Sequence, residues 1–235
     1  MTKRTLDFYF DYLSPYAYFS WRQIQPLCQR LDIVLRPHPV VFGKLLDHWG
    51  QLGPAEIPPK KSALYKYCYR YAQLQGFEFN PPRYHPYNPL PALRLSLAEL
   101  CHEQQPQLIS ALFSAGWSQG ADLGSTTELT AILNRAGFDG AARLAAIDTA
   151  AVKIALRRET EQAIAQGVFG VPTFIVDGEL FWGNDQLEHL ELYLQGRDPL
   201  NHERVNEMLT RDRGIDRKKT ADPARRTGRK EGVTP

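Results

Sequence analysis

The spacing of hydrophobic residues changes twice along the chain, and this change constrains the fold most. The spacing begins at two residues, lengthens to three or four, and then returns to two. Residues 6–11 alternate between two kinds of side chain, which predicts a strand. Ser14 is a good N-cap and Pro15 suits a first helical turn, so we expect a helix to begin there. Residues 33–36 predict a second short strand, closed by prolines. The chain therefore begins with a β-α-β unit.

The middle of the chain is dominated by helical spacing. Residues 42–59 are rich in Gly and Pro and predict a connection, residues 60–75 predict a helix, and residues 80–91 predict an extended, proline-rich loop. Further segments rich in Ala and Leu have the three-to-four spacing of helices, namely 92–104, 107–119, 128–136 and 148–166. We therefore expect a long helical block after the first unit.

The last part of the pattern returns to strands. Residues 173–176 are β-rich, Asp177 and Gly178 form a hairpin signal, and residues 180–182 supply the partner strand. Asn184 or Asp185 can cap a final helix. The chain thus ends its folded part with a β-β-α unit.

A βαβ unit and a ββα unit separated by helices have the order of a thioredoxin-like fold. We predict an α/β fold in which residues 1–45 and 167–205 form one discontinuous domain. Residues 46–166 would be an inserted all-helical domain, and residues 206–235 a basic tail without ordered structure.

Composition excludes several classes of protein. A chain of 235 residues with 43% hydrophobic content is not a disordered one. The tail carries a net charge of +4 and the remainder −2, so we expect no nucleic-acid partner.

No apolar run reaches the roughly 18 residues of a membrane span, and acidic residues interrupt the N-terminal segment, so we expect neither membrane span nor secretory signal. Three scattered cysteines, Cys28, Cys68 and Cys101, predict reduced thiols, no metal site and a cytoplasmic location.

Two positions have the potential for chemistry. Ser14 stands where the first N–H groups of a helix lack partners, and these groups favour an anion such as a thiolate or a carboxylate. The same residue also serves as a plain N-cap, and the two roles are compatible. Val171 precedes Pro172 at the start of a strand. A cis bond there would present the N–H and C=O of Val171 to an extended peptide, whereas a trans bond would simply begin the strand.

Three segments together resemble the 2-hydroxychromene-2-carboxylate isomerase family: DFYFDYLSPYAYF at 7–19, GVFGVPT at 167–173 and LFWGNDQL at 180–187. That family is related to kappa-class glutathione transferases and to the DsbA-like thioredoxin fold. The stretches at 50–61 and 88–95 extend the similarity over roughly residues 5–195. Gln51 departs from the asparagine that relatives usually have.

The resemblance implies glutathione as cofactor and a homodimer. It implies a cis/trans isomerase that converts a 2-hydroxychromene-2-carboxylate to a trans-benzylidenepyruvate by reversible addition of the thiolate. Ser14 would donate a hydrogen bond to the sulfur and, lacking a CxxC pair, would exclude disulfide chemistry. A kappa-like transferase that conjugates glutathione to a small electrophile is the alternative, and a non-catalytic binding protein is a third reading.

The resemblance also assigns site residues. Val171 would bond the tripeptide backbone, and the γ-glutamyl end would be held by a short segment, comprising Trp182, Gly183, Asn184 and Asp185. Asp185 can accept from the ammonium group and Asn184 can donate to the carboxylate. The small aromatic carboxylate substrate would contact three further residues, Lys44, Lys61 and Tyr84.

Overall fold

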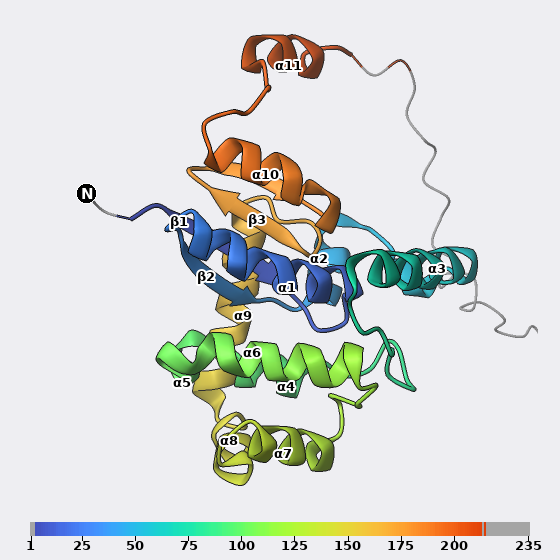
Figure 1. Ribbon diagram of the computed structural model, residues 1–235, viewed down its shortest axis with the longest axis vertical. Helices are drawn as coiled ribbons and strands as arrows, with labels where there is room; N and C mark the ends of the chain where they lie inside the picture. The colour runs from blue at the N-terminus through green and yellow to red at the C-terminus, as the bar shows by residue number, and fades with distance from the viewer. Residues whose placement is uncertain (1–2, 213, 215–235) are drawn as a thin grey trace, which may run out of the picture. The chain divides into compact units, whose positions relative to one another are not determined.

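The computed structural model describes residues 3–212 and 214. Its sheet has the strand order β2-β1-β3-β4, built from β1 (Thr5–Phe10), β2 (Val34–Pro39), β3 (Thr173–Val176) and β4 (Glu179–Trp182). Strands β1 and β2 are parallel, whereas β3 pairs antiparallel with both β1 and β4 (Figure 1). The predicted α/β class and the βαβ…ββα order are therefore confirmed.

Helices cover both faces of the sheet. On one face, Phe8 stacks on Trp21 of α1 (Pro15–Arg30), with ring centroids 5.7 Å apart. On the same side Phe181 contacts Tyr193 of α10 (Leu187–Leu194) at 5.5 Å. The other face packs Tyr9 and Ile175 in one cluster with residues of α2 (Phe42–Trp49) and α9 (Ala150–Ala165). Because both faces are covered, alternation along β1 does not leave a solvent-exposed side.

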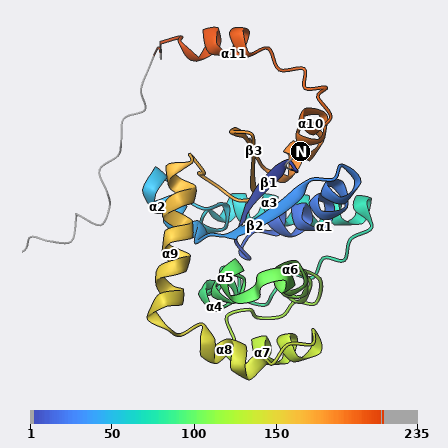
Figure 2. The ribbon, with the colours of Figure 1, turned by 90° about the vertical axis from the view of Figure 1, so that its left-hand side faces the viewer.

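The helices between β2 and β3 share a core with the sheet. They are α3 (Pro58–Gln75), α4 (Leu90–Leu95), α5 (Ala98–Cys101), α6 (Gln105–Phe113), α7 (Thr126–Arg135) and α8 (Gly140–Ala146), together with α2 and α9 (Figure 2). Phe113 lies 5.5 Å from Phe10 of β1, and the indole of Trp117 donates to the carbonyl of Tyr12 at 2.9 Å. The helical segment is an insertion in chain order, but it packs onto the sheet within one compact unit that ends at Asp198.

Several predicted boundaries differ from the structure. Residues 42–59, predicted as a connection, contain α2 and a 3₁₀ turn, Pro54–Glu56. Residues 92–104 are divided between α4 and α5, and α8 was not predicted. Strand β2 continues through Pro39, which is possible because it is an edge strand and needs no N–H on its outer side.

A second unit begins at Pro199 and contains α11 (His202–Leu209). Asn201 caps this helix by accepting from the Arg204 N–H at 2.9 Å. Residues 206–209, which the sequence assigned to the tail, therefore belong to a helix. The remainder of the predicted tail, at 213 and 215–235, lies outside the described residues. In the part that the structure describes, no helix is both long and apolar enough to cross a membrane.

Candidate active site

Ser14 lies in the turn between β1 and α1 and is only 6% exposed. Its hydroxyl oxygen accepts from the Ala17 N–H at 3.1 Å, so the N-cap role is confirmed. The same hydroxyl donates to the carbonyl of Val171 at 3.2 Å. The fold therefore joins two predicted site residues that are 157 positions apart in the sequence.

Asp11 supports this turn from inside the protein. The side chain is fully buried, and its two oxygens accept from the N–H groups of Leu13 and Phe42, each at 2.9 Å. No cation neutralises this carboxyl among the described residues. Burial consequently raises the pKa of Asp11 to about 7, although the two backbone hydrogen bonds oppose the rise.

Val171 lies beside the Ser14 turn, and its peptide bond to Pro172 is cis. The carbonyl of Pro172 accepts from the Gly183 N–H at 3.0 Å, which fixes the segment after β4 beside Val171. The N–H of Val171 has no hydrogen-bond partner among the described residues. It is therefore available to an extended ligand.

A groove of about 590 Å³ is lined by the residues that the resemblance assigned to glutathione apart from Ser14, namely Val171, Trp182, Gly183, Asn184 and Asp185. Asn184 is 4% exposed, and its carbonyl oxygen accepts from Ser20 at 3.0 Å. Its amide nitrogen, in contrast, makes no hydrogen bond within the described part of the chain, although the Asn184 side chain lies close enough to Tyr67 to oppose the rise that burial causes in the pKa of that phenol. A buried donor without a partner is costly, so the groove is suited to a ligand that brings an acceptor.

Two glycines are required by the shape of this groove. A Cβ on Gly170 would lie 2.5 Å from the indole nitrogen of Trp182. Gly183 has a φ of +112°, and a Cβ there would lie 2.3 Å from a carboxylate oxygen of Asp185. Larger residues at these positions would displace the two side chains that line the groove.

A second cavity, an apolar slot of about 240 Å³, contains Ser14 in its wall. The slot shares residues with the groove, namely Tyr16, Phe42, Leu46, Pro54 and Val171. Its charged lining residue among those described is Glu56, whose carboxylate already accepts from the Gly53 N–H at 2.7 Å. The two cavities are neighbours that share Val171, and Ser14, which donates to the carbonyl of Val171, lines the slot.

His85, to which the sequence gave no role, also lines the slot. One ring nitrogen bonds the carbonyl of Leu13 at 2.8 Å, and the other bonds the hydroxyl of Tyr65 at 3.0 Å. Burial lowers the pKa of His85, so the ring is neutral, donating to Leu13 and accepting from Tyr65. This arrangement holds the residue next to Ser14, and no sequence signal marks it.

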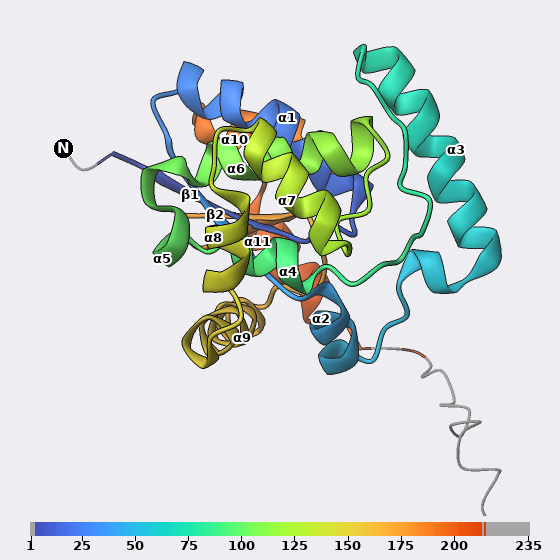
Figure 3. The same cartoon turned by 90° about the horizontal axis from the view of Figure 1, so that it is seen from below.

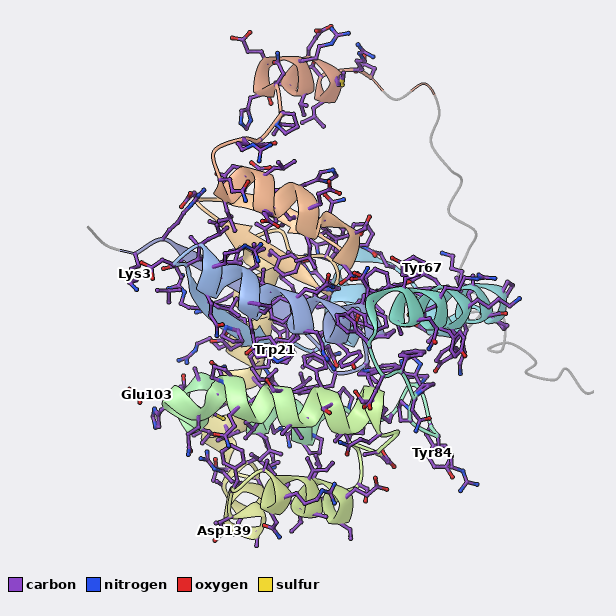
Figure 4. All side chains as sticks on the ribbon, viewed as in Figure 1. Lys3, Trp21, Tyr67, Tyr84, Glu103 and Asp139 are labelled. Carbon is purple, nitrogen blue, oxygen red and sulfur yellow. The ribbon has the colours of Figure 1, made fainter. Side chains whose placement is uncertain are left out.

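The three residues predicted to bind substrate lie outside the groove and the slot. Lys44 is exposed on α2 and pairs with Asp47 at 3.0 Å. Tyr84 is 57% exposed at the outer tip of its loop (Figure 4). Lys61 donates to the carbonyl of His85 at 2.8 Å, and His85 in turn lines the slot. The structure thus brings the predicted glutathione residues together but not the predicted substrate residues.

Gln51 and Lys60 line the groove although the sequence placed neither there. The three cysteines are free and buried, so none presents a thiol to the site. Burial raises the pKa of Cys28 and of Cys68 to about 12, which keeps these thiols protonated at neutral pH.

Comparison with known proteins identifies the family of the chain. Residues 5–195 match the model of the DSBA-like thioredoxin domain. A 2-hydroxychromene-2-carboxylate isomerase from Sphingobium xenophagum is 30% identical over 83% of this chain and 99% of its own length. Glutathione S-transferase kappa 1 from Rattus norvegicus is 29% identical over 82% and 91%.

Solved structures agree with these relatives. A 2-hydroxychromene-2-carboxylate isomerase structure superposes with a TM-score of 0.75 at 25% identity and covers 88% of this chain and all of its own. A probable DsbA oxidoreductase from Streptomyces coelicolor has a TM-score of 0.62 at 17% identity and shows the fold alone. The chain therefore belongs to the DsbA-like thioredoxin family and, within it, to the family of 2-hydroxychromene-2-carboxylate isomerases.

Proposed function

We propose that this isomerase binds glutathione in the groove and isomerises a small aromatic carboxylate of the 2-hydroxychromene-2-carboxylate type in the adjoining slot. The observation that carries the proposal is the buried amide nitrogen of Asn184, which has no hydrogen-bond partner among the described residues and lies in a groove that shares Val171 with the slot containing Ser14. The named activity of the relatives supports the same reaction class.

The groove residues fit the tripeptide. Asn184 offers a donor to the γ-glutamyl carboxylate, and Asp185 offers an acceptor to the ammonium group beside it. The free N–H of Val171 suits the extended peptide backbone. When bound, glutathione would supply a thiolate that adds to the conjugated double bond of the ring-opened substrate and leaves after rotation about the resulting single bond.

Ser14 has the donor that such a sulfur requires. Its hydrogen bond to Val171, at 3.2 Å, is longer than the roughly 2.5–3.0 Å typical of hydroxyl donors. The hydroxyl can therefore exchange the carbonyl for an anionic sulfur at little cost, and this would favour the ionised form of the thiol. Because a serine cannot form a disulfide, the position supports isomerisation and not thiol oxidation.

Calorimetric titration with glutathione tests the groove. Asp185→Ala and Asn184→Leu should each weaken binding by about tenfold to a hundredfold, the usual cost of removing a hydrogen bond to a charged group. Glu188→Ala is the matched control, because Glu188 follows on α10 but does not line the groove. Unchanged affinity in both groove variants would exclude this site.

A conjugating transferase is the second candidate, because kappa-class relatives match most of the chain. The two reactions differ in the fate of the thiol. An isomerase returns glutathione after each turnover, whereas a transferase consumes one molecule per product. Free thiol should therefore stay constant while a 2-hydroxychromene-2-carboxylate is converted, and stoichiometric loss would establish the transferase.

A further inference from the structure

A third cavity, of about 750 Å³, lies between α3 and the loop formed by residues 79–85. Figure 3 shows this loop running alongside α3. We call it the basic cavity because four cations line it, namely Lys61, Lys66, Arg70 and Arg83. It is separate from the groove and contacts the slot through one shared residue, His85.

The positive charge of the basic cavity is not compensated. No acidic side chain is among its lining residues in the described part of the chain, and α3 itself contains no Asp or Glu. Within the same described residues, none of the four cations forms an ion pair with a carboxylate. Lys66 and Arg70 are exposed and one helical turn apart, so an anion can reach both.

Aromatic rings form the other walls of the basic cavity. Phe79 is fixed by a parallel stack on Trp117, with ring centroids 5.9 Å apart and an interplanar angle of 3°. Tyr65 is held by its hydrogen bond to His85, whereas Tyr69 is 59% exposed. Flat apolar walls beside free cations match a planar aromatic molecule that carries a negative charge. An inorganic anion would leave these rings uncovered.

The slot has the opposite character. Its wall contains Ser14 and many apolar groups but no lysine or arginine among the described residues. The basic cavity therefore offers four cations to the carboxylate of an aromatic acid, whereas the slot offers none and the adjoining groove offers Lys60. His85 stands between the two cavities, with its ring in the wall of both.

We propose that the basic cavity is a second binding site for planar aromatic carboxylates, from which they reach the slot past His85. The choice of ligand rests on the proposed function, but binding at this site requires neither glutathione nor turnover. The site would raise the local concentration of an anionic substrate, as cation-lined clefts do in general.

Calorimetric titration with 2-naphthoate, an unreactive aromatic carboxylate, tests this site in the full chain without glutathione. The double variant Lys66→Gln and Arg70→Gln should raise the Kd about tenfold or more, because it removes two partners of the carboxylate. The control is Lys3→Gln with Lys153→Gln, which removes the same net charge from exposed positions outside the basic cavity. The neutral analogue 2-naphthalenemethanol should bind the wild-type protein at least about tenfold more weakly.

Three results would overturn the inference. An unchanged Kd in the cavity variant would place naphthoate in the slot. An equal loss in the control would show only a long-range effect of charge. Displacement by inorganic phosphate at equal concentration would show a site for anions in general. Glutathione titration of the same variant keeps the two proposals apart, because the groove does not contain Lys66 or Arg70 and its affinity should not change.

Discussion

Asp7 lies within β1 and Asp11 directly follows the strand, four residues further on, and their surroundings are opposite. Asp7 accepts two hydrogen bonds from Arg36, at 2.8 and 3.1 Å, and one from His38 at 2.9 Å. Burial alone would raise the pKa of Asp7, but these partners lower it below 3.8. Asp11 has only backbone partners, and burial raises its pKa to about 7.

The difference in ion pairing distinguishes the region of the sheet around Asp7 from the candidate site around Asp11. His38 also bonds Glu159 of α9 at 2.9 Å, so the charges around Asp7 tie β1, β2 and α9 together. None of these charged residues lines the groove or the slot. Asp11 instead holds Leu13 and Phe42, which both line the slot. The ion pairs of Asp7 thus stabilise the sheet, whereas the candidate site is held by the carboxyl group of Asp11, which has no counter-ion among the described residues.

His38→Leu should have the largest effect on stability. Burial alone would lower the pKa of His38, but the hydrogen bonds to Asp7 and Glu159 raise it to about 9. The variant would leave two half-buried carboxylates without their shared cation and should reduce the free energy of unfolding by about 2–3 kcal/mol at pH 6. Urea denaturation measures this loss, with His202→Leu on the exposed surface of α11 as the control.

The sign of the pH dependence sharpens that test. A folded-state pKa of about 9 lies above the ordinary 6.5, so the contribution of His38 is complete below pH 6.5 and is lost as the pH rises through 9. The difference between wild type and His38→Leu should therefore shrink between pH 7 and pH 10. A difference that stays constant over this range would show that His38 acts by packing alone.

Asp11→Asn should have a slightly smaller effect, of opposite sign. Because the folded-state pKa of about 7 lies above the ordinary 3.8, the wild type loses stability as the pH rises from 3.8 through 7. Asparagine does not titrate, but its amide nitrogen cannot accept from the second backbone N–H, so the variant should be about 1 kcal/mol less stable than the wild type near pH 4. Between pH 4 and pH 8 it should gain about 2 kcal/mol relative to the wild type.

The matched control for this prediction is Asp47→Asn, an exposed aspartate on α2. Denaturation at pH 4 and pH 8 should show no comparable gain there. If Asp11→Asn instead loses more stability at pH 8 than at pH 4, the charged carboxylate is needed to hold the N–H groups of Leu13 and Phe42, and Asp11 belongs with Asp7 as a structural ion.

The sequence predicted the elements that have a clear local period. Ser14 was found as the start of α1 because N-cap, proline and helical spacing coincide. The hairpin of β3 and β4 was found because Asp177 and Gly178 both adopt positive φ, as their residue types favour. Helix α2 was missed because Gly43 and the neighbouring prolines resemble a loop, whereas its helical state depends on packing against α9 and the sheet.

The groove and the slot differed in how far the sequence could predict them. Two short segments, 169–172 and 182–186, line much of the groove, and the resemblance covers both. The slot is assembled from distant segments, and His85 reaches Leu13 across 72 positions. Lys44 was assigned because it matches a basic position of the family, and in the structure it lies on α2 and pairs with Asp47. Such contacts depend on tertiary structure, which one sequence does not encode as a local pattern.

The smallest expected effect is that of Arg36→Gln. Arg36 makes a bidentate pair with Asp7, but its side chain is 58% exposed and solvent screens the interaction. Since His38 remains to neutralise Asp7, the free energy of unfolding should fall by only about 0.5 kcal/mol, and less in 1 M salt. Urea denaturation at low and high salt measures both quantities. A loss as large as that of His38→Leu would mean that Arg36, and not the buried histidine, is the cation that fixes this end of the sheet.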